Sequence, residues 1–474
     1  MRLYILIIFT IIQTISLSQN ISLNDAVQLA IHNNLEIKQS ESQIKQKKAL
    51  QEGATGLMLP KISLTGGYTW FNGNPEVNMK QFKPAIDDMA GKYGAVMAKE
   101  LNLSPATQDD IYKAIVGGLN DLPAYNLDID FNRFPNASIN AVQPIFNGGK
   151  ILNTKRLSST QLELAKINYE SSKDIITKKI IDNYLTILLL ENIVKNRSDN
   201  IKNIKTHIKN SEKLVTEGIV TKHYLLKAKV ELSNAERLLN ADQNKLSIAK
   251  INLNKTLNIK KDSVLILIDK LEFKIQNTDL EQLKEQAKKE QILLQIADKK
   301  IQISKYNLNL KKADMLPKVF AYANYSFFNS YMPVIMPPFV AGIQLKYNIF
   351  NGTTDYKKIK SAQYLNDEII ISKEKTEKTI DFLIEKAYKE AKNAEYSYIK
   401  LDNTIELAKE HEKIVQRRYD EGIDRSVDVV DAKLITSTAQ IDQLIELYKY
   451  YISLTNLYFT VGIPEHTIFL ITKQ

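Results

Sequence analysis

Few side chains in this 474-residue sequence are of types that support catalysis or metal binding, and their spacing fits neither. The five histidines lie in separate segments, and there is no cysteine to supply a thiolate, a disulfide or a soft metal ligand. "HEKIV" at 411–415 begins like a zinc-binding helix, but Val415 stands where the second histidine must be. The sequence also lacks a glycine-rich phosphate loop and a nucleophile elbow. We therefore expect no catalytic residue, no metal site and no cofactor.

One pair of carboxylates has a spacing that could serve an electrostatic purpose. Asp428 and Asp431 are three residues apart, which places both on one face of a predicted helix. The helix dipole also favours acidic residues in a first turn, so the pair has an ordinary structural explanation as well. Whether this pair of carboxylates has an electrostatic function depends on the helices and strands that position it.

The first 18 residues predict export. Arg2 precedes an apolar run over 3–15, and "SLS" at 16–18 follows, which is the layout of a cleaved signal peptide. The run is short for a bilayer span, so an N-terminal anchor is the weaker alternative. The formal charge of +10 comes from lysines interspersed with glutamates, and we expect a solvated basic surface without a nucleic-acid partner.

The chain contains an internal repeat. "LPK" occurs at 59–61 and 316–318, an offset of 257, whereas "TEGI" at 216–219 and "DEGI" at 420–423 are offset by 204. The difference, 257 − 204 = 53, corresponds to one insertion in the first copy, at about 72–133. Both halves therefore share one order of elements.

Each half begins with a predicted short amphipathic helix, with Ser22 as the N-cap of the first and Thr278 or Asp279 as that of the second. Pro60 and Pro317 then break the helical pattern. The two halves together contain four predicted strands, each of about ten residues. A strand of this length can cross a bilayer when it is tilted. A half-buried sheet of a soluble protein shows the same alternation. The alternating apolar residues lie at 62–70, 137–145, 319–327 and 341–349.

Long proline-free segments predict two helical hairpins. Apolar residues at spacings of three and four, as over 387–419, indicate a heptad seam, and residues 150–217 would form a helix about 100 Å long. Each long helix ends at a glycine, and the returning helices end at Asn258 and Gly462, types that accept a left-handed C-cap. In the insertion, Ser104 and Pro105 predict the start of another helix.

Four strands cannot close a barrel, and open sheet edges are not tolerated in lipid. Strands and hairpins together therefore predict an oligomer that shares one barrel. With this layout the chain resembles the TolC-type outer-membrane efflux proteins. The resemblance is carried by "SLNDAVQLAIHNN", both "LPK" segments, "QPIFNGGK", "YNIFNG" and "RRYDEGIDRSVDVVDAKLITSTAQ".

The resemblance implies a mostly α protein with membrane β-strands, built from two structural repeats. A homotrimer would form a twelve-stranded barrel in the outer membrane of a Gram-negative bacterium and an α-helical barrel in the periplasm. Its partners would be a periplasmic adaptor, an inner-membrane pump and outer-membrane lipid. The expected segments are a signal peptide (1–18), first repeat (19–259), linker (260–278), second repeat (279–463) and tail (464–474).

The resemblance also assigns candidate site residues. Gly218, Gly422, Ile219 and Ile423 match the helical tips that dock the adaptor, and Asp428, Asp431 and Tyr419 match the pore gate. Asp424 replaces an arginine of the family's gate with Arg425 adjacent, and Tyr224 replaces an aspartate, so the closing bonds must differ. From the change of period we add the barrel–tunnel junction: Pro60, Pro317, Gly148 and Gly352.

The function expected is a passive exit duct for a tripartite efflux pump or a type I secretion system. Drugs, metal ions, siderophores and polypeptides all remain open as cargo. The alternative is an exported coiled-coil structural or surface-adhesive protein without a conduit, which has no need of the four alternating strands.

Overall fold

The computed structural model describes residues 19–70, 72, 76–78, 82–120, 126–128, 133–218, 221–328 and 337–472. The expected signal segment, 1–18, lies outside them. The chain divides into two compact units. The helical unit takes its residues from 1–54, 152–312 and 353–474, and the strand unit takes its residues from 55–151 and 313–352.

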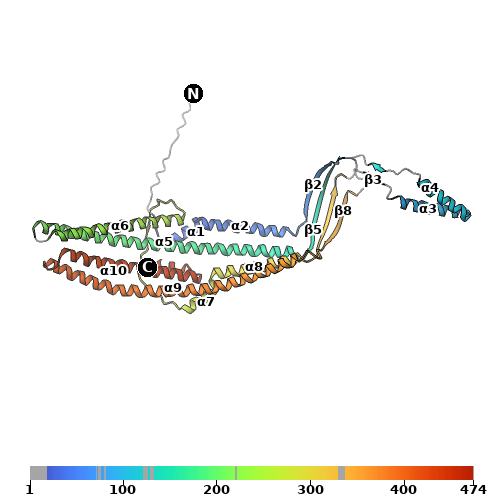
Figure 1. The fold of residues 1–474 in the computed structure, drawn as a ribbon. Helices are drawn as coiled ribbons and strands as arrows, with labels where there is room; N and C mark the ends of the chain where they lie inside the picture. Colours follow the sequence, from blue (N-terminus) through green and yellow to red (C-terminus); the bar gives the residue numbers. More distant parts are fainter. Residues whose placement is uncertain are drawn as a thin grey trace, which may run out of the picture. The chain divides into compact units, whose positions relative to one another are not determined.

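Two long hairpins make up most of the helical unit (Figure 1). The first pairs α5 (Lys150–Thr216) with α6 (Lys222–Leu257), and the second pairs α9 (Thr354–Asp420) with α10 (Ser426–Val461). The helix expected over 150–217 is therefore confirmed. Asn258 and Gly462 cap the returning helices in the left-handed conformation, as expected.

Small and apolar side chains at heptad spacing hold the second hairpin together. Ala387, Ala391 and Ala394 of α9 are buried in one core with Leu447 and Leu454 of α10. Alanines on this face let the two helices approach closely along their length. The hairpins are consequently stiff supports for whatever their ends carry.

Two shorter helices lie in each half where one was expected. Ser22 caps the first of them by accepting from the N–H of Asp25, and Asp279, not Thr278, caps its counterpart. The second helix of each pair ends four residues before Pro60 or Pro317, so these prolines do not themselves end a helix. The four helices are α1 (Leu23–Asn33), α2 (Leu35–Gly56), α7 (Leu280–Glu290) and α8 (Ile292–Ala313).

In each pair, a single residue with a side-chain amide lies between the two short helices. Asn34 donates to the carbonyl of Thr256 at 2.8 Å, and its own oxygen accepts from the N–H of Glu36. Gln291 donates likewise to the carbonyl of Thr460 at 2.5 Å and accepts from the second residue of α8. Each amide thus caps a short helix and attaches it to the last turn of a returning helix.

A small parallel sheet joins the start of the described chain to the expected linker. β1 (Gln19–Ile21) pairs with β6 (Leu265–Leu267). The buried hydroxyl of Tyr184 lies 2.6 Å from the carboxylate of Asp269, which also accepts from the N–H of Leu23. Burial and this carboxylate raise the pKa of Tyr184, so the hydroxyl stays a donor.

The expected C-terminal tail contains α11 (His466–Thr472), whose Ile468 and Ile471 are buried in the helical core. In the part of the chain that the structure describes, we find no helix with the length and apolarity of a membrane span.

The four expected strands are present and form one antiparallel sheet in the strand unit, in the order β2-β5-β7-β8. Their register places the apolar residues on one face, where the rows Leu64–Ile139–Tyr325–Phe339 and Ile62–Ala141–Ala323–Ala341 cross the sheet. This face is open in the single chain, with Leu64 72% and Ile343 73% exposed. The strands are β2 (Lys61–Trp70), β5 (Arg133–Asn147), β7 (Lys318–Ser326) and β8 (Phe339–Lys346).

The opposite face is polar and hydrogen-bonded across strands. Thr65 and Ser138 join their hydroxyls at 2.9 Å, and Asn140 donates to Thr65 at 3.1 Å. Asn324 then donates to Asn140 at 2.6 Å. A sheet with one apolar and one polar face separates two different environments.

Two strand ends differ from the expected pattern. A β-bulge lies between Pro144 and Phe146, so Ile145 is an extra residue, and the expectation that it continues the outward alternation is wrong. Pro144 lacks the N–H that a regular ladder needs, which accounts for the irregularity there.

β8 ends at Lys346, so Tyr347 and Ile349 lie beyond the strand in which they were expected. β5 continues to Asn147 because β7 runs along its second edge. Among the described residues, β8 has no strand on the corresponding edge.

The insertion contains a helical hairpin, α3 (Lys83–Glu100) and α4 (Pro105–Asn120), and a short β3–β4 pair (Glu76–Asn78 with Asn126–Asp128). Ser104 accepts from the N–H of Thr107, which confirms the expected cap of α4. α3 was not expected. The remainder of the insertion lies outside the described residues.

Candidate functional site

The free ends of the two hairpins have the same local geometry. Gly218 and Gly422 both have φ near +76°, and each donates its N–H to the residue three positions earlier, Val215 or Tyr419. Such a backbone conformation suits glycine. Ile423 is exposed beside its glycine, whereas Ile219 lies outside the described residues. We call the two turns and the adjoining helix ends the tip.

Tyr419 is half-buried at the tip. Its ring packs against Val429 and Ala432 of α10 and meets the edge of His207 of α5, with ring centroids 6.0 Å apart. His207 is itself buried, and its Nδ1 has no hydrogen-bond partner among the residues that the structure describes. Burial lowers the pKa of His207, and Lys433 lowers it further.

Both carboxylates of the expected gate are paired within the chain. Asp428 receives two hydrogen bonds of 2.8 Å from the guanidinium of Arg425, which lowers the pKa of Asp428. Asp428 also accepts the N–H of Arg425 and so caps its own helix. Asp431 lies 3.4 Å from the ammonium of Lys227. Each carboxylate of the pair therefore has a cationic partner within its own chain.

Several of these contacts join the two hairpins. Arg425 of the second hairpin lies over the ring of Tyr224 in the first and donates to its hydroxyl at 3.4 Å. The hydroxyls of Ser211 and Ser426 meet at 2.6 Å between α5 and α10. Together with Lys227 and Asp431, these contacts hold the two turns beside each other in one chain.

A third acid of the tip, Asp424, has a different kind of partner. The guanidinium of Arg418 binds the carboxylate of Asp424 through two hydrogen bonds, of 2.8 and 2.9 Å. This pair lies within the second hairpin and spans its turn. Asp424, which replaces an arginine of the family pattern, thus fixes the shape of the turn.

Sequence reasoning missed Lys227 and His207 as members of the tip. The internal repeat contained a signal for Lys227, because adding 204 to its number gives Asp431, and adding 204 to Tyr224 gives Asp428. The contact between Lys227 and Asp431 thus joins equivalent positions of the two repeats, which carry opposite charges. His207 gave no such signal, since its burial depends on three packed helices.

The four expected junction residues all belong to the strand unit, whereas the tip residues belong to the helical unit. Gly148 has φ +65° and Gly352 has φ +56°, and Thr353 follows the second at φ +64°. A Cβ on Gly148 would lie 2.6 Å from the carbonyl of Ala313, whereas one on Gly352 would meet open space. Steric crowding therefore requires glycine at Gly148 but not at Gly352. Pro60 and Pro317 directly precede β2 and β7.

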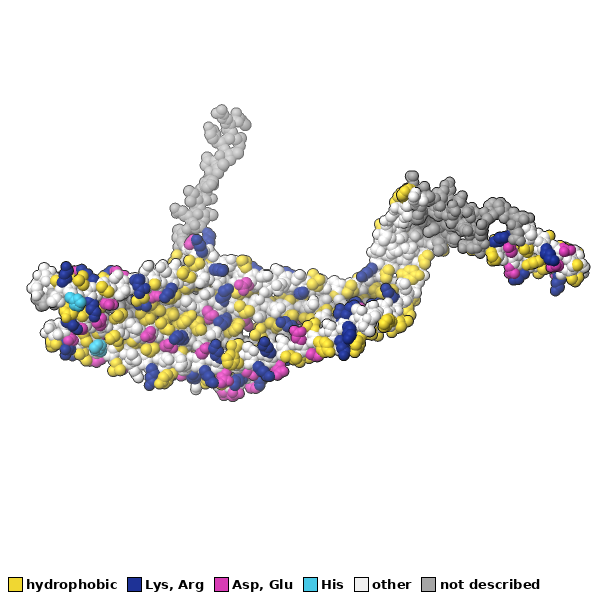
Figure 2. Space-filling model, viewed as in Figure 1, with side chains coloured by type: hydrophobic (Ala, Val, Ile, Leu, Met, Phe, Trp, Pro, Cys, Tyr) yellow, Lys and Arg dark blue, Asp and Glu magenta, His cyan; other side chains and the backbone are white. Residues whose placement is uncertain are grey.

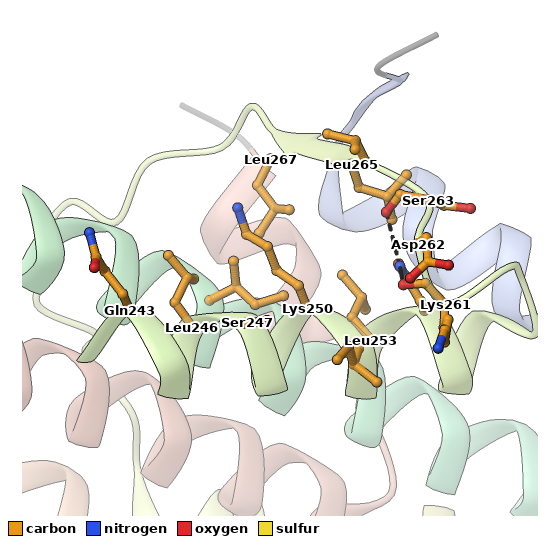
Figure 3. A pocket seen from close by; sticks show the side chains of 14 residues that line it. Gln243, Leu246, Ser247, Lys250, Leu253, Lys261, Asp262, Ser263, Leu265 and Leu267 are labelled. Atoms are coloured by element: carbon orange, nitrogen blue, oxygen red, sulfur yellow. Dashed lines mark hydrogen bonds between the residues drawn. The ribbon is translucent and has the colours of Figure 1, made fainter. Parts of the chain in front are cut away.

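A pocket of about 470 Å³ lies between α6 and residues 261–267, where Leu246 and Leu253 face Leu265 and Leu267 (Figure 3). Two of its polar side chains are already bonded: Lys250 pairs with Glu191 at 2.8 Å, and the amide of Asn254 donates to two backbone carbonyls. Within the described residues, no group of three histidine or acidic side chains is arranged to hold a metal ion.

Comparison with known proteins agrees with this geometry. Residues 131–258 match the family model of the outer membrane efflux protein. A search of curated proteins gave no significant match.

Solved structures share the fold along most of the chain. The CmeC outer membrane channel of Campylobacter jejuni is 14% identical with a TM-score of 0.72, over 93% of this chain and 86% of that one. The outer membrane protein VceC of Vibrio cholerae is 14% identical with a TM-score of 0.71, over 93% and 96%. The open MtrE outer membrane channel of Neisseria gonorrhoeae is 11% identical with a TM-score of 0.68, over 93% and 89%. The family match over residues 131–258 and the fold shared with these channels both agree with the resemblance to the TolC-type outer membrane efflux proteins.

Proposed function

We propose that three copies of this chain form an outer-membrane duct, with a shared twelve-stranded barrel and a periplasmic helical tunnel. Substrates would pass through it passively, driven by an inner-membrane pump that a periplasmic adaptor connects to the tip. The outer membrane of a Gram-negative bacterium is the location that suits this design. A tripartite efflux pump and a type I secretion system both use such a duct.

The observation that carries the proposal is the sheet of the strand unit. It combines an exposed apolar face, a hydrogen-bonded polar face and an outer edge on β2 and on β8 without a partner strand among the described residues. In lipid, every backbone group of a strand must find a partner, so such a sheet needs further copies to close it. An adhesive coiled coil has no use for this arrangement.

The pairing of β5 with β7 supplies a register for the contact between copies. Gln143 of β5 lies opposite Ala321 of β7. By the two repeat offsets, 143 + 204 gives Tyr347, and 321 − 257 gives Leu64. We therefore expect Tyr347 of one copy opposite Leu64 of the next, which would extend β8 beyond Lys346 just as β7 extends β5.

This register can be tested because the chain has no cysteine. Purified protein that carries Leu64→Cys and Tyr347→Cys is expected to form a disulfide-linked ladder up to a trimer on mild oxidation. The control pair is Leu64→Cys with Lys346→Cys, since a shift of one residue turns the second side chain to the other face.

The same preparation is expected to migrate as a heat-modifiable trimer and to conduct ions in planar bilayers. A monomeric, soluble protein without conductance would contradict the duct and support the coiled-coil adhesive alternative.

We infer further that the tip is the gate. Asp428 and Asp431 of three copies would place six carboxylates around one axis, and each faces a cation of its own chain. Rings of carboxylates attract cations in channels. Here multivalent cations must compete with Arg425 and Lys227 for them.

We predict that Asp428→Asn together with Asp431→Asn weakens the block of single-channel current by multivalent cations. The substitution removes the carboxylates and leaves Arg425 and Lys227 uncompensated, so selectivity should also shift toward anions. Asp420→Asn, an exposed acid in the last turn of α9, is the control and should leave the block unchanged. An unaltered block in the double variant would remove these residues from the gate.

The exposed end of each hairpin is the surface that we assign to the adaptor. Ile423 is 60% exposed beside Gly422, an apolar side chain on an otherwise charged turn. Ile423→Glu is expected to abolish co-purification of the adaptor while the trimer remains intact. Undiminished co-purification would place the docking surface elsewhere.

The buried histidine predicts that acid opens the tip. The pKa of His207 is lowered in the folded chain, so its burial stabilises the tip fully above the ordinary pKa of about 6.5 and progressively less below it. Lys433 of α10 opposes protonation, whereas Asp420 and Glu412 of α9 favour it. We expect the open probability in bilayers to rise as the pH falls from 7.5 to about 5.5.

His207→Gln, which stays neutral over this range, is expected to abolish that rise. His411→Gln is the matched control, because His411 occupies the equivalent position in the other half and is exposed. A rise that persists in His207→Gln would assign the pH response to another group.

A further inference from the structure

The helical hairpin of the insertion has an apolar surface that its own partner helix does not cover. α3 packs on α4 through Gly91 and Gly94, where a Cβ would lie 2.1 Å from the ring of Tyr112 and 2.5 Å from Ile115. This close contact uses the small-residue side of α3. The hydrophobic side chains of the hairpin are visible between its charged ones in Figure 2.

The opposite side of α3 carries large apolar residues at spacings of four, three, four and three, which we call the α3 seam. Its residues are Phe82, Ile86, Met89, Tyr93 and Val96. All five are between 42% and 69% exposed. A sustained four–three spacing is the pattern of a helix that packs along another helix in a coiled coil. Aromatic and methionine side chains are also enriched at protein contacts.

The residues that flank the seam favour an identical helix in parallel orientation. Lys92 and Lys99 lie on one flank, and Ala90 and Met97 on the other. Parallel copies related by rotation set the lysine flank of one helix beside the alanine–methionine flank of the next. Antiparallel copies would set lysines against lysines, which repel.

The charges of the hairpin do not select a charged partner. Lys92 pairs with Asp88 at 2.6 Å, and Lys113 pairs with Asp109, in both cases within one helix. A strongly anionic surface would therefore have to compete with the carboxylates that these two lysines already bind.

We propose that the α3 seams of three copies pack together as a parallel three-helix coiled coil. The contact would give the trimer an interface separate from the sheet edges and the long hairpins. This inference rests on the trimer of the proposed function. The seam is too exposed and too regular to be an ordinary surface insertion.

The experiment uses the full-length protein in its membrane with a single introduced thiol. On oxidation, Tyr93→Cys is expected to convert monomer to disulfide-linked dimer, leaving one chain of each trimer unlinked. Asp110→Cys, at an exposed position on α4, is the control and should stay monomeric. Heat-modifiable migration of each variant checks that the trimer has assembled.

The outcomes separate this inference from the proposed function. If Tyr93→Cys stays monomeric while the Leu64→Cys, Tyr347→Cys pair cross-links, the α3 coiled coil is wrong and the duct stands. If neither cross-links and no trimer forms, both fail. Labelling of Tyr93→Cys by a lipid-soluble but not a water-soluble maleimide, without cross-linking, would overturn the inference in favour of a membrane-surface helix.

Discussion

The incomplete sheet is the constraint on which the rest of the structure depends. Four strands expose an apolar face and leave β2 and β8 each with an outer edge that has no strand among the described residues. Neither feature is stable for one chain in lipid or in water, so we interpret the chain as one part of a larger ring. The doubled layout follows from this: each copy adds two equivalent strand pairs and two equivalent hairpins. Stiff helices then transmit the ring's symmetry to the tip.

At the tip, the pairing of acids with cations of the same chain is more important than the sign of any single charge. The acids Asp424, Asp428 and Asp431 all face cations of the same chain, so these three acids add little net field at the tip. Exposed pairs of this kind stabilise a fold only weakly. They therefore suit contacts that must separate and re-form. The buried His207 against Tyr419 is different, because separating these rings admits water to a group that has no partner.

Local patterns predicted the local features. Cap residues, the long helices and the four strands could be recognised because periodicity and capping depend on neighbours in the sequence. The separation of α1 from α2 could not, since it depends on the bond from Asn34 to Thr256, 222 residues later. The end of β8 and the bulge at Ile145 likewise depend on which strand lies alongside. Burial of His207 required three helices to meet, and one sequence does not contain that information.

The small β1–β6 sheet has a consequence for biogenesis. The first strand of the described chain finds its partner, and Leu23 its bond to Asp269, only after nearly 250 further residues have been made. Until then β1 lacks its partner strand, and proteases or chaperones can reach it. Docking of this segment would therefore mark a subunit as complete. A chain truncated before the linker would keep its first strand unpaired, and degradation would remove it before it joined a ring.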